Sequence, residues 1–393
     1  MTPAQTTIVS VNSLGATAPS EPIQNEPTTK SGIPIRNVWY MLLYAWSAYR
    51  KKDRLSVKVD QAPSLDALLA SVLADQIEQR IRIGLQRDYI LTESLVAGIR
   101  GRINFGESLK RFSFHRGQAY CHHDVFCADV LNNQIIRSTL DRVAQIGDFG
   151  AKRQIGDNLR ARIRRLVRNL EGIDLIELTA EQIRRQRLKR TDADYGLMLA
   201  ICHLLYHRLM PTEDVGVERL PGLDRDDLTL FEIFEQFVAQ FFTFHLSRDW
   251  DVGAQQRINW TSERECSHLP AMRLDVRLEH RQTGELVYLD TKFTAGILVA
   301  SQFGKQCFDS SHLFQIYAYL RSQEDYSPAH RSTTGILLYP ASNLRLSESV
   351  NIQGHDIRWE TLDLAQRWEG IEHDLLAIPA ATLARLPRLS PAS

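Results

Sequence analysis

The sequence predicts two domains of different class. Residues 33–215 are expected to form an α+β domain with a small β-rich module among helices, and residues 225–380 a layered α/β domain. Three observations support this. The chain of 393 residues is long enough for two domains, strand-like stretches interrupt a helical first half, and the second half alternates between helical and strand-like periodicity. A stretch rich in Pro, Gly and Asp, 211–228, marks the boundary.

The first half begins after a tail. Residues 1–32 are rich in Thr, Ser, Pro, Ala and Gln and contain few large apolar residues, which predicts disorder. A short second tail is expected over 381–393. The aromatic and aliphatic stretch 38–46 indicates a largely buried helix, and Ser64 is a plausible N-cap for an amphipathic helix over 65–86.

Residues 89–126 form the predicted β-module, with strands over 89–96 and 120–126. Glycines interrupt the stretch 98–105, which predicts a strand pair or a bend. If this stretch is extended, Arg100 and Arg102 lie together on the face opposite Ile99 and Ile103. Because arginine makes forked contacts with carboxylates and phosphates, these two residues contact either a protein partner or a DNA backbone, or are solvated.

A zinc site in the β-module is disfavoured. The candidate ligands Cys121, His122, His123, Asp124 and Cys127 are close in sequence. A structural zinc site usually has four ligands in two pairs, and no second pair with such spacing follows.

Three more helices are predicted before the boundary, over 131–146, 156–171 and 195–209. Basic residues concentrate in and after the second of them: Arg160, Arg162, Arg164, Arg165, Arg168, Arg184, Arg185, Arg187, Lys189 and Arg190. This region is either a solvated helix face with a charged linker or a surface that contacts phosphates.

The second half is predicted to order its elements as helix, strand, strand, helix, strand, strand, helix. A long aromatic helix over 230–246 contains the acidic residue Glu235. The other elements are expected as strands over 272–278, 286–289, 335–340 and 357–364, and as helices over 302–320 and 363–378.

The pair of strands over 272–293 contains the candidate site. Thr283-Gly284 predicts a turn, so that a hairpin can bring Asp275 beside the end of the second strand. There Asp290 and Lys292 are two residues apart and share a face of an extended chain. Two carboxylates at the end of a buried strand are costly unless they pair or bind a cation, and Mg²⁺ prefers such oxygen ligands. The alternative is a hairpin with solvated charges, which the apolar run before Asp290 disfavours.

Composition limits the function classes. Lys+Arg and Asp+Glu both total 47, so no overall positive field indicates nucleic acid, although a local patch suffices to bind it. Five cysteines without regular spacing fit a reducing cytoplasm. We find no membrane span, signal peptide or nucleotide-binding P-loop, so any nucleotide-driven motor is expected on another chain.

Five blocks in order resemble the McrC family, the nuclease subunits of McrBC-type 5-methylcytosine-dependent restriction systems. They are residues 33–46, 98–105 and 131–140, then Asp275 with Asp290-Thr291-Lys292, and last 315–319 with its Gln-x-x-x-Tyr pattern. The spacing of Asp275 and Asp290-x-Lys292 is also similar to the signature of the PD-(D/E)xK nuclease superfamily. The resemblance covers about 33–378 and implies a PD-(D/E)xK restriction-endonuclease-like C-terminal domain.

The resemblance also implies roles. Asp275, Asp290 and the backbone carbonyl of Thr291 would hold Mg²⁺, and Lys292 would position the attacking water or steady the transition state. Gln315 and Tyr319 would face the same site, and Glu235 corresponds to a superfamily helix acid that varies among members. The N-terminal half would dock on McrB, an AAA+ GTPase that reads the methylated base, and stimulate it. Double-stranded DNA would be the substrate; a non-cleaving activator of the GTPase and a stand-alone nuclease are the alternatives.

Overall fold

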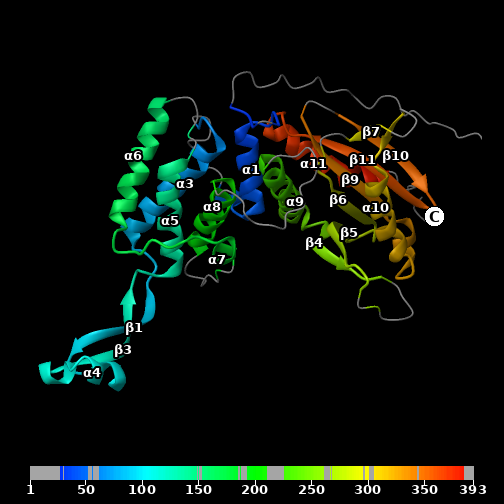
Figure 1. The fold of residues 1–393 in the computed structure, drawn as a ribbon. Coiled ribbons are helices and arrows are strands. Elements are labelled where there is room, and N and C mark those ends of the chain that lie inside the picture. Colours follow the sequence, from blue (N-terminus) through cyan, green and yellow to red (C-terminus); the bar gives the residue numbers. More distant parts are fainter. Residues whose placement is uncertain are drawn as a thin grey trace, which may run out of the picture.

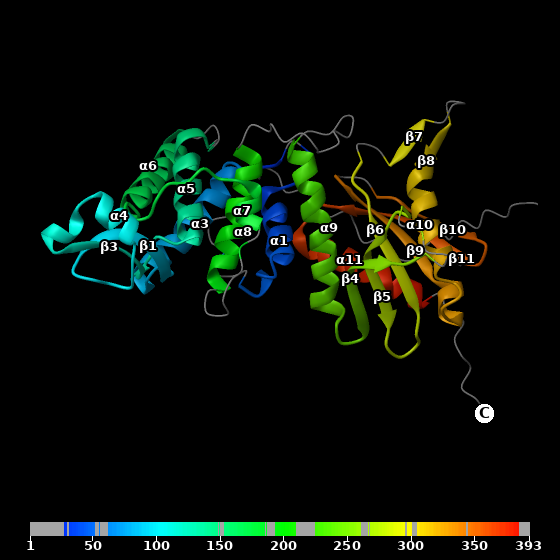
Figure 2. The same ribbon diagram turned by 60° about the horizontal axis from the view of Figure 1, so that its bottom comes forward.

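The computed structural model describes residues 27–384, with gaps at 30, 52–54, 56–61, 148, 150–152, 185, 187–192, 210–224, 261–265, 267, 295–296, 301–304 and 343–344. These residues form an elongated molecule in which a protruding β-module, a helical part and an α/β part follow one another (Figures 1 and 2). The described residues start at Pro27, before Ile33, where the ordered chain was expected to begin. The Ile35 amide donates a hydrogen bond to the Pro27 carbonyl at 3.0 Å. None of the helices in these ranges is long and apolar enough to cross a membrane.

Helices form the middle of the molecule: α1 (Ile35–Ala45), α3 (Leu65–Ile83), α5 (Leu131–Ile146), α6 (Arg153–Asn169), α7 (Ala180–Arg184) and α8 (Ala193–Leu209). All except the short α7 were predicted from the sequence. Helix α3 begins as expected because the Ser64 hydroxyl accepts a hydrogen bond from the Ala67 amide at 3.1 Å. It ends at Ile83 and not at 86, since Gly84 leaves the helical conformation at φ 119°.

The basic region is divided by its contacts. Arg162 is an internal tie between α6 and α3, because its guanidinium bonds Asp75 at 2.6 Å and Glu78 at 2.7 Å. Arg164, Arg165 and Arg168 are exposed on the outer face of α6. Arg185, Arg187, Lys189 and Arg190 lie outside the described residues.

The β-module consists of β1 (Asp88–Ala97), β2 (Arg102–Ile103), β3 (Gln118–Cys127) and the short helix α4 (Phe105–Lys110). Its antiparallel sheet has the order β1-β3-β2. The expectation of one extended face through Arg100 and Arg102 is wrong, because only Arg102–Ile103 is strand. Gly101 turns the chain at φ 69°, and a side chain there would come within 2.3 Å of the His122 carbonyl oxygen. Arg100 therefore lies on a turn and Arg102 on β2, both exposed.

The α/β part is built on a six-stranded mixed sheet with the order β10-β11-β9-β6-β5-β4. Its elements are α9 (Arg225–Leu246), β4 (Trp250–Ile258), β5 (Met272–His280), β6 (Leu286–Thr291), α10 (Ser310–Ser322), β9 (Thr334–Ala341), β10 (Ser347–Ile352), β11 (His355–Asp363) and α11 (Trp368–Ala384). A separate two-stranded ribbon pairs β7 (Leu298–Ala300) with β8 (Gln306–Phe308). The three inner strands β6, β9 and β11 are parallel, and the outer neighbours are antiparallel.

Helix boundaries in the second half differ from the sequence prediction, and strands were missed there. The helix expected over 302–320 begins at Ser310, because 306–308 pairs with β7. The helix expected over 363–378 begins at Trp368, since Asp363 still belongs to β11, and it runs to Ala384, beyond the expected domain end at 380. Strands β4 and β10 were not predicted; β10 is an edge strand whose residues are mostly exposed, so it has no apolar alternation to detect.

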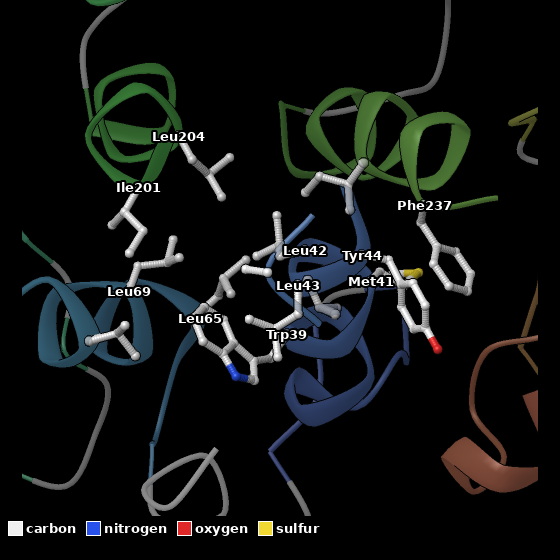
Figure 3. Close-up of a cluster of buried hydrophobic side chains, with 14 of the residues drawn as sticks. Trp39, Met41, Leu42, Leu43, Tyr44, Leu65, Leu69, Ile201, Leu204 and Phe237 are labelled. Carbon is white, nitrogen blue, oxygen red and sulfur yellow. The ribbon is translucent and has the colours of Figure 1, made fainter. Parts of the chain in front are cut away.

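Helix α1 connects the two parts of the core. Its side chains contact α3 and α8 on one side and α9 on the other (Figure 3). The Tyr44 hydroxyl also contacts His245 of α9 at 2.7 Å and Glu372 of α11 at 3.1 Å. The first helix of the chain thus shares one apolar core with the sheet. Most of the boundary predicted at 211–228 lies outside the described residues.

Candidate functional site

Strands β5 and β6 bring the candidate acids together because both are strongly held in the sheet. Leu274, Val276 and Leu278 are fully buried, and all six residues of β6 are buried. The last antiparallel pair is Val276 with Leu289, so Asp275 follows directly beyond the paired part, beside the end of β6. One carboxylate oxygen of Asp275 accepts hydrogen bonds from the amide and the hydroxyl of Thr291, each at 2.7 Å.

A chain of polar contacts runs from Asp290 to α10. The Lys292 ammonium lies 2.5 Å from Asp290 Oδ2 and donates a hydrogen bond to Gln315 Oε1, also at 2.5 Å. The Gln315 amide in turn donates to the Tyr319 hydroxyl at 2.7 Å. Because Gln315 and Tyr319 are one helical turn apart on α10, they lie on the same side of the helix. Of the six predicted side chains, Asp290, Lys292, Gln315 and Tyr319 are thereby linked to one another, and Asp275 lies next to them through Thr291.

Glu235 reaches the site from α9, beside Asp275. Its carboxylate accepts a hydrogen bond from Gln255, and its pKa is raised by burial and then by the nearby charge of Asp275. Gln255 was not predicted. It has φ 52°, a left-handed conformation that few non-glycine residues adopt, and such backbone strain is concentrated at functional sites. The sequence carries no signal for it, because β4 lacks a clear periodicity.

The site holds more negative than positive charge. Three carboxylates, Glu235, Asp275 and Asp290, face one ammonium, that of Lys292. Burial raises the pKa of Asp290 to about 7, even though Lys292 acts in the opposite direction. His312 on α10 is a further neighbour that the sequence analysis missed; burial and the charge of Lys292 both lower its pKa.

The residues fit a hard divalent cation. No three acidic, histidine or cysteine side chains of the described residues already form a closed metal cage. Mg²⁺ does not require one, because it commonly takes one or two carboxylates and completes its shell with water and substrate phosphate. Asp290 Oδ2 is buried and contacts the Lys292 ammonium at 2.5 Å. Because three carboxylates share this one ammonium, a cation between Asp275 and Asp290 would offset the remaining negative charge.

We expect the substitution Asp290→Asn to stabilise the metal-free protein at alkaline pH. The folded-state pKa of Asp290 is about 7, against an ordinary value of 3.8. The folded state therefore prefers the protonated form, and stability is lost between about pH 4 and pH 7 as the unfolded state ionises first. At 1.4 kcal/mol per pH unit the loss is at most about 4 kcal/mol. Thermal unfolding with a chelator should show a Tm gain that is larger at pH 8 than at pH 5; an equal gain at both would contradict this.

Fold and site together define an α/β protein with a buried carboxylate and lysine cluster at the sheet, attached to a helical part with a protruding β-module. Residues 20–340 match the family model described as McrBC 5-methylcytosine restriction system component. The chain belongs to this family, as its sequence blocks suggested.

The chain is similar to one curated protein in sequence and to two solved structures. It is 25% identical over 354 residues to the type IV methyl-directed restriction enzyme EcoKMcrBC of Escherichia coli K12. The match covers 88% of this chain and 97% of that protein. Among solved structures, a half-complex of Thermococcus gammatolerans McrB AAA+ hexamers with bound McrC matches at a TM-score of 0.50 and 14% identity, over 88% of this chain and 76% of that one. The T. gammatolerans McrBC complex matches at 0.38 and 16% identity, over 56% and 60%.

Proposed function

We propose that the protein is an McrC-type, Mg²⁺-dependent DNA endonuclease subunit of a modification-dependent restriction system, with a PD-(D/E)xK-like site in its α/β part. The single observation that carries this proposal is the convergence of Asp275 of β5 with Asp290 and Lys292 at the end of β6, where one ammonium faces more than one carboxylate. Buried acids that repel one another are costly, and a site that binds a cation and phosphate gives them a purpose. Family membership supports the restriction context and modified DNA, such as DNA with 5-methylcytosine, as the substrate.

In the proposed site, Asp275, Asp290 and the Thr291 carbonyl hold the Mg²⁺ ion, and Glu235 adds negative charge from α9. The ion supplies charge stabilisation at the phosphate and acidifies a bound water. Thr291 fixes Asp275 through two hydrogen bonds, so that its second oxygen stays directed away from the amide. Lys292 provides the positive charge that steadies a phosphate whose negative charge grows during cleavage. Gln315 and Tyr319 keep that ammonium in place.

The β-module is proposed to dock on an AAA+ GTPase of the McrB type. It exposes an unusual number of large apolar side chains: Tyr89, Leu91, Leu95, Ile99, Phe105, Leu109, Phe112, Phe114 and Phe126. Ile99 is 70% and Phe112 71% exposed. Two pairs of these rings are in contact, Tyr89 with Phe126 and Phe105 with Phe114. Exposed apolar side chains that gather in this way mark a site of association, and the β-module lies at the far end of the molecule, where it is accessible (Figure 1). Arg100 and Arg102 lie beside it and are proposed to contact the partner.

One reconstitution tests the proposed function. Purified protein is mixed with methylated DNA, Mg²⁺ and GTP, with and without an AAA+ GTPase of the McrB type. We expect cleavage and stimulated GTP hydrolysis only in the complete mixture. Stimulation without cleavage would identify a non-cleaving activator, and cleavage without the partner would identify a stand-alone nuclease.

A further inference from the structure

A second feature of the sheet lies beside the acids. A cavity of about 240 Å³ is lined by residues of β4, β5 and β6 and by residues at and after the end of α10, among them Arg257, Asn259, Arg277, Gln323, Tyr326 and His330. We call it the β5–β6 cavity. Arg277 and Tyr288 are a cross-strand pair of β5 and β6. Tyr288 is two residues before Asp290 on β6, so these two side chains lie on the same face of the sheet.

Helix α10 runs from the acids to the β5–β6 cavity. Gln315 and Tyr319 contact the Lys292 end, and Gln323 lies one turn further on the same side of the helix. Gln323 lines the cavity and donates a hydrogen bond from its amide to the Asn259 carbonyl at 3.0 Å. A strand of substrate whose phosphate sits at the acids therefore has its neighbouring nucleotide close to this cavity.

The side chains that line the cavity suit a nucleobase better than a phosphate. Arg277 is already paired, with Glu279 and with Asp251 at 3.6 Å. Burial and the charge of Arg277 lower the pKa of His330, so this ring is neutral near pH 7. Arg257, exposed at the rim, makes no ion pair within the described ranges and remains as a cation for the backbone. Amide groups and tyrosine rings make up most of the remaining polar lining, and these are the groups that hydrogen-bond base edges and stack on bases.

The volume of the cavity suits one small flat group and not a larger ligand. It is below the range of about 300–1,000 Å³ of pockets for drug-sized ligands. Tyr326 is 62% exposed, and its ring lies 5.8 Å from that of His330, so a flat aromatic group can reach it from solvent.

We propose that the β5–β6 cavity takes one unpaired nucleobase of the DNA strand, next to the phosphodiester that is cleaved. Tyr326 stacks on the base, the amides of Asn259 and Gln323 lie along its edge, and Arg257 holds the adjoining phosphate at the rim. The inference rests on the proposed function for its substrate, and it makes local unpairing of the duplex part of substrate binding. Unpairing costs a few kcal/mol, which the cavity offsets in part.

The test measures binding without cleavage. Full-length protein in chelator is titrated against a labelled single-stranded oligonucleotide, and against a sugar-phosphate oligomer of the same length without bases, by fluorescence anisotropy. Base stacking on an aromatic ring contributes about 1–3 kcal/mol, so Tyr326→Ala should weaken binding of the oligonucleotide by about tenfold or more, and Tyr326→Phe little. Neither should change binding of the oligomer without bases. Arg257→Ala should weaken both ligands, with a shallower salt dependence.

Arg345→Ala is the matched control, because Arg345 is an exposed arginine of the same part that pairs with Asp374 and does not line the cavity. An equal loss with Arg345→Ala, an equal loss of both ligands with Tyr326→Ala, or a wild type that does not bind the oligonucleotide would each overturn the proposal. The proposed nuclease function is judged separately by the reconstitution. A protein that binds as described and never cuts retains the cavity assignment as a binding site and loses the nuclease assignment.

Discussion

The substitution Asp290→Ala is expected to lower DNA cleavage by about two to three orders of magnitude, the typical cost of removing one group that stabilises developing charge. Asp290 is 2% exposed, and its carboxylate is the one that contacts Lys292. Removing it frees the lysine and takes away a proposed metal ligand. The protein should remain folded, since the lost group is a source of repulsion and not of packing.

The measurement is the cleavage rate of the reconstituted complex at saturating Mg²⁺, with thermal unfolding as the check on folding. Asp275→Ala should lose a similar amount of activity and also some stability, because the Thr291 amide and hydroxyl lose their acceptor. Glu348→Ala, which changes an exposed acid on the edge strand β10, serves as the control and should cut normally. Near wild-type cleavage by Asp290→Ala would rule out the metal-site assignment.

Loss of partner stimulation is the second large effect, expected for the triple substitution Arg100→Ala, Arg102→Ala and Phe112→Asp. Each side chain is exposed, and the β-module lies at the opposite end of the molecule from β5 and β6 (Figure 2). A charge placed in an apolar contact, together with two lost guanidinium groups, should reduce GTPase stimulation by on the order of tenfold or more, as central interface residues do. GTP hydrolysis is measured without DNA, so that any effect on DNA affinity is excluded.

Lys292→Ala is the reciprocal variant. It should stop cleavage and leave GTPase stimulation unchanged, because Lys292 belongs to the site on the sheet and touches no residue of the β-module. If stimulation disappears with Lys292→Ala in a folded protein, the division of labour between the two ends is wrong. If the β-module variant stimulates normally but binds DNA more weakly, the arginines contact phosphate and not the partner.

The local sequence pattern was sufficient to predict many of the helices and strands of this protein. The helix at 131–146 follows from the spacing of its apolar residues and agrees with α5 at both ends. The alternation of Leu274, Val276 and Leu278, the Thr283-Gly284 turn and the apolar run before Asp290 specified the hairpin, and with it the meeting of Asp275 and Asp290. These features depend on neighbours a few residues apart, and side-chain periodicity reports such neighbours directly.

Tertiary structure decided what depends on residues far apart. The left-handed backbone of Gln255 and its contact with Glu235 come from the packing of β4 against α9, and no short-range pattern encodes them. The sequence left a strand pair and a bend open for 98–105, and the close approach of Gly101 to His122 on β3 decides for a bend between Arg100 and Arg102. Helix α1 is apolar over most of its surface because it packs on both sides, against α3 and α8 and against α9 (Figure 3). The sequence could predict that α1 is buried, because apolar side chains show that a helix is covered. It could not predict which elements cover α1, because that depends on the packing of residues far apart in the chain.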